Sequence, residues 1–480
     1  MKNSKWVSAA LASALLITAG VGSVSAASVN SSGKTSTNKK TAIQATVKVK
    51  EGTATWTVNG TPVAFKTIDS NGYKLYSLSQ VAGEMGAALT WGANGIELND
   101  SQGLHTIQLK AGSKSYQVDG SQQTFTVAPV AYKGKIYVQL TKFVLGLGGE
   151  LQTNPNIILS PARPAGEFET MHWTADGRII ANQGDAEFTQ IFKFSTVQGN
   201  YETFSSDERA TDFSVSPDQT WGAFTDDKGQ MNLINLLNGV VKTLGTDTSV
   251  KTDLTWSQDG KKIYFIQGDK QEKISQISVE TGVVTEVLAD KVENKSELRI
   301  SADEKTAVYI VNLTGVAKND ADSTEDSLTV DFSKAGEQLY KLALGTKDAK
   351  PVALTTTPDN KLYPEILADG SITYLSADPD GNTINTIKTI KADAAVSDLT
   401  LDIEVTWSAK VSSGLIVAGT ATDGSTRIYS TTPAGSKTEL YRTTKDVAEI
   451  AVSDDGSKLA IIIDGKILVI QNGKALQLTK

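Results

Sequence analysis

Acidic side chains recur at one position of a repeated pattern that fills the C-terminal two thirds of the chain. The pattern ends in a short turn, and this position lies four residues before the turn begins. From the first copy to the last it is occupied by Thr170, Asp212, Asp253, Glu297, Tyr363, Glu404 and Glu449. Two residues further on, the copies carry His172, Ser214, Thr255, Arg299, Glu365, Thr406 and Ala451. Carboxylates that lie close together attract cations and raise one another's pKa.

The residues that alternate with these positions along each strand are nearly all apolar, as at Trp173, Trp256 and Trp407. Because side chains alternate between the two faces of a β-strand, we expect the apolar set to pack between sheets and the polar set to face the other way. If these strands line a central channel, the acidic residues form a ring near one mouth. The candidate ligand-binding residues are then Asp212, Asp253, Glu297, Arg299, Glu365, Glu404 and Glu449. The alternative is that each carboxylate accepts hydrogen bonds from its own connecting loop.

The turns that follow these strands recur at a nearly constant spacing. Their first residues are Thr174, Ser216, Ser257, Ser301, Leu367, Ser408 and Ser453. Successive turns are 42, 41, 44, 66, 41 and 45 residues apart. Each interval has room for four short strands, which is typical of a propeller blade, and a blade needs its neighbours to cover its faces. The spacing therefore predicts a seven-bladed β-propeller over residues 161–480.

Two of these turns carry a recognisable motif. Ser216-Pro217-Asp218 and Ser257-Gln258-Asp259-Gly260 resemble the WD40-like repeats of the TolB-type propeller family. The resemblance implies the fold and specifies no activity, because this fold carries many unrelated functions. The one long interval contains an insertion near residues 315–338, which is either a disordered loop or a lid over a binding site.

The N-terminal part of the chain, residues 45–160, contains one motif used twice. Gly72, Leu78, Ser79, Val81 and Gly86 recur 62 residues later as Gly134, Leu140, Thr141, Phe143 and Gly148. Asn59-Gly60 and Asp119-Gly120 are typical of tight hairpin turns, since these residues tolerate a positive φ. In each copy we expect a strand and then a short helix, with the Ser or Thr as its N-cap and the last Gly closing it in the left-handed conformation.

The first copy contains Val58-Asn59-Gly60, Leu75-Tyr76-Ser77-Leu78 and a segment from Met85 to Trp91. In these features it resembles the copper amine oxidase N-terminal-like stalk domain, which occurs on exported proteins of Gram-positive, spore-forming bacteria and has no known chemistry as a family. Oxidase chemistry itself is excluded, because it needs three histidines to hold copper and the chain has only His105 and His172. The expected fold is mainly β, with a small duplicated α+β stalk domain followed by the propeller.

The first 44 residues have the composition of an export signal and a linker. Lys2 and Lys5 precede an uncharged, mostly apolar run from Val7 to Val21, and Val24-Ser25-Ala26 is a small-residue cleavage pattern. We expect a signal peptide over residues 1–26 and a flexible leader over residues 27–44. The expected location is secreted or extracellular, with attachment to the cell wall as one option. No membrane span is expected after signal removal.

Composition narrows the function classes further. The chain has no cysteine, so disulfides and thiolate metal sites are excluded, and its net charge of −8 argues against nucleic acid as a partner. No catalytic motif, metal site or cofactor site is recognisable. We expect a non-catalytic protein whose propeller binds a protein, glycan or cell-wall component. The alternative is a carboxylate-dependent glycan hydrolase or lyase at the channel mouth, which would need two carboxylates about 5 to 10 Å apart.

Overall fold

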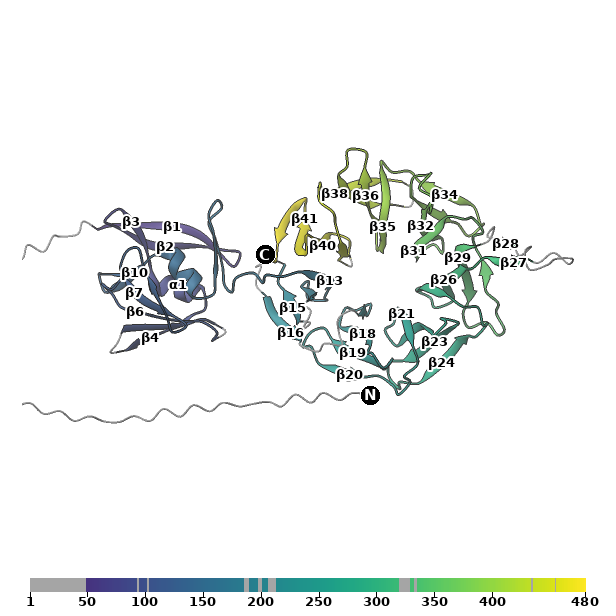
Figure 1. The fold of residues 1–480 in the computed structure, drawn as a ribbon, viewed down its shortest axis with the longest axis horizontal. Coiled ribbons are helices and arrows are strands. Elements are labelled where there is room, and N and C mark those ends of the chain that lie inside the picture. Colours follow the sequence, from purple (N-terminus) through teal and green to yellow (C-terminus); the bar gives the residue numbers. More distant parts are fainter. Residues whose placement is uncertain are drawn as a thin grey trace, which may run out of the picture. The chain divides into compact units, whose positions relative to one another are not determined.

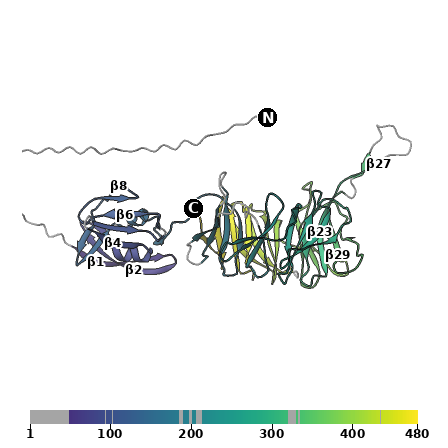
Figure 2. The same ribbon diagram turned by 90° about the horizontal axis from the view of Figure 1, so that it is seen from below.

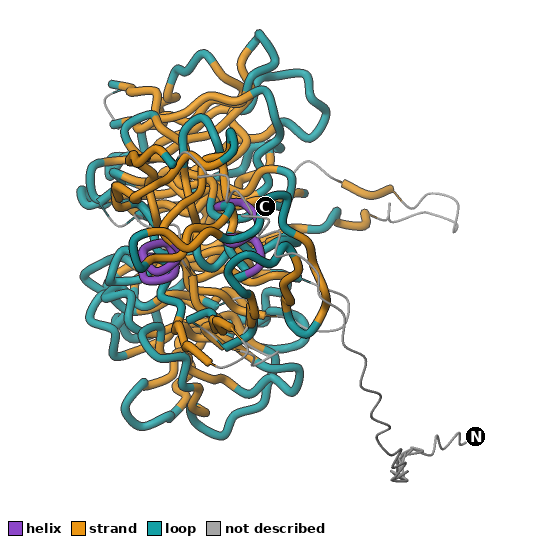
Figure 3. Tube along the Cα trace, turned by 90° about the vertical axis from the view of Figure 1, so that its left-hand side faces the viewer, coloured by secondary structure: helices purple, strands orange, loops and turns teal. Residues whose placement is uncertain are grey.

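The computed structural model describes residues 49–480, except residues 93–94, 102, 185–189, 197–200, 206–212, 319–328, 332–334, 433–434 and 454. The predicted signal peptide and leader therefore lie outside the described residues. The described residues are mainly β-strand, with two short helices (Figure 3). None of their helices has the length and apolar character needed to cross a membrane.

The N-terminal domain consists of two β-sheets and two helices around one large apolar core, with a smaller apolar cluster beside it. Its elements are β1 (Lys50–Val58), β2 (Thr61–Ser70), β3 (Tyr73–Ser77), α1 (Leu78–Glu84), β4 (Ala88–Gly92), β5 (Gly95–Asn99), β6 (Thr106–Leu109), β7 (Ser115–Val118), β8 (Ser121–Thr124), β9 (Val130–Tyr132), β10 (Lys135–Val138), α2 (Leu140–Gly146), β11 (Glu150–Gln152) and β12 (Ile157–Leu159). One sheet has the order β11-β12-β1-β2-β3-β10-β9, and the other has the order β4-β5-β6-β7-β8. Phe65, Ile107 and Phe143 from the two sheets and α2 are fully buried in the shared core.

The turn chemistry predicted for this domain is confirmed. Asn59 and Gly60 have φ values of 46° and 83°, and Asp119 and Gly120 have φ values of 50° and 75°, as tight hairpin turns require. Gly86 ends the first helix in the left-handed region, at φ 71°. The predicted N-caps are wrong by two residues: α1 begins at Leu78 and α2 at Leu140, and Ser79 and Thr141 lie inside the helices. Leu78 and Leu140, the first residues of the two helices, are buried in the core, so each helix begins one residue before the Ser or Thr.

In the rest of the chain, the described residues form seven four-stranded antiparallel sheets, one after another in sequence. Their strands are β13 (Phe168–Trp173), β14 (Ile179–Gln183), β15 (Gln190–Phe194), β16 (Tyr201–Ser205); β17 (Ser214–Val215), β18 (Trp221–Thr225), β19 (Met231–Asn235), β20 (Val241–Thr243); β21 (Lys251–Trp256), β22 (Lys262–Gln267), β23 (Lys273–Ser278), β24 (Val284–Leu288); β25 (Lys295–Ile300), β26 (Thr306–Leu313), β29 (Gly336–Ala343), β30 (Val352–Ala353); β31 (Asn360–Ile366), β32 (Ile372–Ala377), β33 (Thr386–Ile390), β34 (Val396–Leu399); β35 (Ile403–Val411), β36 (Gly414–Ala421), β37 (Thr426–Thr431), β38 (Lys437–Thr443); β39 (Glu449–Val452), β40 (Lys458–Ile463), β41 (Lys466–Gln471) and β42 (Lys474–Gln477). The sheets are arranged around a centre, with first strands such as β21, β31 and β35 on the inner side (Figure 1). This is the β-propeller architecture that the repeats predict.

Each sheet buries its apolar side chains against its neighbours. Ile263 and Phe265 of β22, for example, pack with Leu233 of the preceding sheet. The last sheet closes against the first in the same way, because Ile462 of β40 and Trp173 of β13 belong to one buried cluster. The ring is therefore held by packing between sheets, and every four-stranded sheet is built from one stretch of chain.

The turn predicted at Ser408 is wrong. Ser408 lies inside β35, and the hairpin comes at Ser412-Ser413, between the paired residues Val411 and Gly414. In five of the other six copies an Asp accepts a hydrogen bond from the hydroxyl that opens the turn, as Asp259 does from Ser257 at 2.8 Å, and in the copy that begins at Leu367 the acceptor Asp369 binds the later Ser371 hydroxyl. Lys410 occupies the position of that Asp, and its ammonium group can only donate hydrogen bonds. The Ser408 hydroxyl therefore finds no acceptor there, and the strand continues.

The long interval between turns contains an extra hairpin. β27 (Val316–Lys318) pairs with β28 (Thr329–Asp331), and β27 stands away from the sheets that contain β23 and β29 (Figure 2). The insertion is shorter than predicted, since Gln338 already belongs to β29. Most of its polar part, residues 319–328, lies outside the described residues.

Candidate binding site on the inner strands of the propeller

Three consecutive inner strands share one irregularity. In β21 the register with β22 shifts between Thr252 and Thr255, so that two residues of β21 lie opposite one residue of β22. This is a β-bulge, and β25 and β31 have one at the same position of the repeat. The first residue of each bulge is left-handed, with φ 54° at Asp253, 53° at Glu297 and 49° at Tyr363. Regular alternation therefore fails here. Because this conformation costs about 1 kcal/mol or more for such residues, its repetition marks a position that the surrounding structure enforces.

Asp253 joins two neighbouring sheets. Its Oδ1 accepts a hydrogen bond of 2.8 Å from the backbone N–H of Glu297. Two residues after Asp253, the Thr255 hydroxyl donates a hydrogen bond to the carbonyl oxygen of Leu298, also at 2.8 Å. Asp253 thus accepts a backbone hydrogen bond, as the alternative interpretation expects, but the donor belongs to the next sheet and not to its own loop.

Arg299 connects two carboxylates from different sheets. Its Nη2 lies 3.1 Å from Oε2 of Glu297, and its Nε lies 3.4 Å from Oε1 of Glu365. Its Nη1 donates to the carbonyl oxygen of Leu298 at 3.0 Å. Burial alone lowers the pKa of Arg299, but the charges of Glu365, Glu297 and Asp253 outweigh it and raise the pKa. The guanidinium is therefore held charged among acidic groups.

Two further groups titrate abnormally at this place. Burial raises the pKa of Glu297, the attraction of Arg299 opposes this, and the charge of Asp253 adds to the rise. Burial also raises the pKa of Tyr363, and the charges of Glu297 and Glu449 raise it further. Tyr363 thus lies within electrostatic reach of both carboxylates. We call Asp253, Glu297, Arg299, Tyr363, Glu365 and Glu449 the channel cluster.

The structure brings together only part of the predicted ring. Contacts join four of the predicted residues, which are Asp253, Glu297, Arg299 and Glu365. The charge of Glu449 acts on the same cluster, because it raises the pKa of Tyr363. Glu404 is exposed and pairs with Thr420 in a regular stretch of β35, whose bulge comes later, at Thr406. Asp212 lies outside the described residues.

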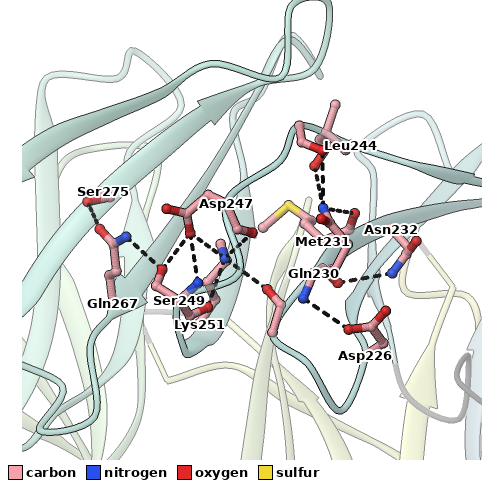
Figure 4. Close-up of polar contacts among 12 residues, drawn as sticks. Asp226, Gln230, Met231, Asn232, Leu244, Asp247, Ser249, Lys251, Gln267 and Ser275 are labelled. Atoms are coloured by element: carbon pink, nitrogen blue, oxygen red, sulfur yellow. Dashed lines mark hydrogen bonds and ion pairs between the residues drawn. The ribbon is translucent and has the colours of Figure 1, made fainter.

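Buried lysines were missed at the sequence level. Lys251, Lys295 and Lys361 have fully buried side chains, each at the beginning of an inner strand. Lys251 Nζ donates to the carbonyl oxygens of Gly229, Asp247 and Ser249 at 2.8 to 2.9 Å and forms an ion pair with the Asp247 carboxylate at 2.6 Å (Figure 4). A signal existed, since all three lysines stand six residues before the turn.

The structure describes no group of three or more His, Cys, Asp or Glu side chains placed to hold a metal ion. His105 is hydrogen-bonded to Asp119 at 2.9 Å, and the ring of His172 lies 4.4 Å from that of Phe213. The segment Asp378-Pro379-Asp380-Gly381-Asn382 resembles the start of a calcium loop. The Asp378 carboxylate accepts hydrogen bonds from the backbone N–H groups of Asp380, Asn382 and Thr383. This carboxylate therefore stabilises a turn.

Fold and site together define a β-propeller protein with a duplicated N-terminal domain and an acidic cluster on its inner strands. Residues 57–157 match the family model of the copper amine oxidase N-terminal domain, which confirms the resemblance of the stalk domain. A search of curated proteins finds no match to the chain.

Several solved structures are similar to the propeller. An oligogalacturonate lyase in complex with manganese is 13% identical, covers 66% of this chain and 86% of its own, and has a TM-score of 0.46. The β-propeller domain of the Trilobed protease from Pyrococcus furiosus is 12% identical, with coverages of 66% and 97% and a TM-score of 0.44. A putative TolB from Agrobacterium tumefaciens is 13% identical, with coverages of 53% and 89% and a TM-score of 0.38. At these identities the similarity concerns the fold alone.

Proposed function

We propose that the chain is an exported, non-catalytic protein whose propeller binds a positively charged group of a protein, glycan or cell-wall component at the channel cluster. The observation that carries this proposal is the repeated left-handed bulge, which presents Asp253, Glu297 and Tyr363 at the same position of three sheets. Strained backbone that recurs in one place is more often found at ligand sites than elsewhere. The extracellular location is proposed from the apolar run and cleavage pattern near the N-terminus.

Charge supports a cationic ligand. With every carboxyl group ionised, the channel cluster contains four carboxylates against the single guanidinium of Arg299. The contacts of Arg299 with Glu297 and Glu365 hold both carboxylates in place. Binding a ligand would therefore cost little side-chain conformational entropy. A ligand amine would be attracted to the remaining negative charge.

The glycan hydrolase or lyase is the weaker candidate. The raised pKa of Glu297 is the property that a general acid needs. However, such an enzyme must place the scissile bond between its two carboxyl groups. Arg299 contacts both Glu297 and Glu365 and so occupies that space.

Titration calorimetry of the mature chain with tri-lysine and with a glucosamine tetramer tests the proposal. Binding of either probe should weaken at least tenfold in Glu365→Gln, because this change removes one charge and keeps the side-chain size. The matched control is Glu404→Gln, which neutralises an exposed carboxylate on another inner strand and should leave Kd within twofold. Equal affinity in the two variants, or a wild-type chain that binds neither probe, would contradict the proposal.

A further inference from the structure

The five-stranded sheet of the stalk domain carries a row of polar side chains across one face. The members lie directly opposite one another in the strand register, one on each strand from β4 to β8, and are Thr90, Glu97, Gln108, Gln117 and Gln122. The next residues along the strands point to the other face, where Ile96, Leu98 and Ile107 are buried in the core. We call these five residues the polar row.

The polar row lies in a depression of about 480 Å³. This volume falls within the range of small-ligand sites. Lys110 also lines it, and Gly92 and Gly95, which pair with each other at the end of β4 and the beginning of β5, line it without a side chain to fill it. Gly95 cannot be replaced freely, because it has a φ of 135° and an added Cβ would lie 2.5 Å from the carbonyl oxygen of Leu109. The shape at this end therefore depends on glycine.

The groups in the row both donate and accept hydrogen bonds. Three are amides, and each amide offers an N–H and a carbonyl oxygen. The Gln108 amide donates to Oε2 of Glu97 at 3.0 Å, and the Gln122 amide donates to the Ser115 hydroxyl at 2.7 Å. These bonds orient the amides and leave their carbonyl oxygens for a ligand. The charges of Glu97 and Lys110 balance, so the depression has no net charge.

We propose that the polar row binds a neutral oligosaccharide that lies across the strands. Sugar hydroxyls donate and accept, as the amides do, and so match them in either direction. Neighbouring strands are about 4.8 Å apart, so the row offers one polar side chain at each such step over about 19 Å, a repeat that suits a polymer of identical units. Because the charges of Glu97 and Lys110 balance, neither a polyanion nor a polycation would gain a net electrostatic attraction here. This site is separate from the channel cluster and does not depend on the function proposed for it.

The experiment measures binding of the full chain to cellohexaose, chitohexaose, xylohexaose and mannohexaose by titration calorimetry. At least one of them should bind, and the double variant Gln117→Ala/Gln122→Ala should raise its Kd at least tenfold. Both residues are exposed, so the fold should persist, which an unchanged melting temperature would verify. The matched control is Gln123→Ala, which removes an exposed amide from the other face of β8 and should change Kd less than twofold.

Further arms separate this proposal from its competitors. Glu365→Gln in the channel cluster should leave hexasaccharide binding unchanged, so a failure of the propeller site does not imply a failure here. The proposal is overturned if none of the four sugars binds, or if Gln123→Ala weakens binding as much as the double variant does. It is also overturned if hexagalacturonate or tri-lysine, and no neutral sugar, binds in a way that depends on Gln117 and Gln122.

Discussion

The indole Nε1 of Trp173 donates a hydrogen bond of 3.1 Å to the carbonyl oxygen of Ala451, 278 positions later in the sequence. Trp256 makes the equivalent contact with Ser214, at 2.8 Å, between two sheets that follow each other in the chain. The join between the first and last sheets therefore uses the same contact as a join between consecutive sheets. No strand has to be exchanged between the ends of the ring, because packing, this hydrogen bond and a backbone bond of 2.9 Å from the N–H of Phe168 to the carbonyl oxygen of Gly465 close it.

Replacing Trp173 by Phe should destabilise the propeller. The change leaves the Ala451 carbonyl without its donor and reduces packing in the cluster that joins the first and last sheets. We expect the free energy of unfolding to fall by about 1 to 3 kcal/mol, as measured by urea denaturation. Trp91→Phe is the control, since Trp91 is 63% exposed, and it should shift stability by less than about 0.5 kcal/mol. Equal stability of the two variants would show that the closing contact contributes nothing.

Replacing Lys251 by Met should cost more. Met fills a similar volume but leaves three carbonyl oxygens and the Asp247 carboxylate without their donor (Figure 4). Removing one partner of a buried ion pair typically costs about 3 to 5 kcal/mol, and we expect the lower end, about 3 kcal/mol, because the side chain of Asp247 is 34% exposed. The same change at Lys261, whose side chain is 79% exposed, provides the comparison and should be nearly neutral. A Lys251→Met chain as stable as Lys261→Met would contradict the structural role of the buried ammonium.

Local chemistry explains which features the sequence could predict. Repeated turns were visible because each depends on its own residues, as in the bond from Ser257 to Asp259. The left-handed Asp253, Glu297 and Tyr363 were not visible, since nothing in their types requires that conformation and neighbouring sheets impose it. The acidic positions were therefore found, but their grouping through Arg299 depends on contacts between sheets that spacing cannot show.

The pair of Glu150 and Arg163 should make stability depend on acid pH. Burial alone raises the pKa of Glu150, but hydrogen bonds from Arg163 and Gln152 lower it to about 2. The folded pKa thus lies below the unfolded value of about 4.3, and the contribution of the pair is present above pH 4.3 and lost as pH falls toward 2. We expect Glu150→Gln to lower the free energy of unfolding by about 2 to 3 kcal/mol at pH 7. The difference from wild type should shrink toward zero near pH 2, and a pH-independent difference would contradict the assignment.

Glu297 should act in the opposite direction. Burial raises its pKa, and Arg299 offsets only part of this rise. The folded protein therefore holds this proton more tightly than the unfolded chain does, so the stability that Glu297 contributes is present below about pH 4.3 and is lost as pH rises through the folded pKa. Glu297→Gln cannot ionise and should lack this loss. The free energy of unfolding of the variant, relative to wild type, should thus increase between pH 4 and pH 7 in urea titrations. Glu404→Gln, which neutralises an exposed carboxylate on another inner strand, serves as the reference. Parallel curves of unfolding free energy against pH for Glu297→Gln and wild type would mean that the Glu297 carboxyl group ionises as it does in water. The bulge would then impose no cost on its charged form.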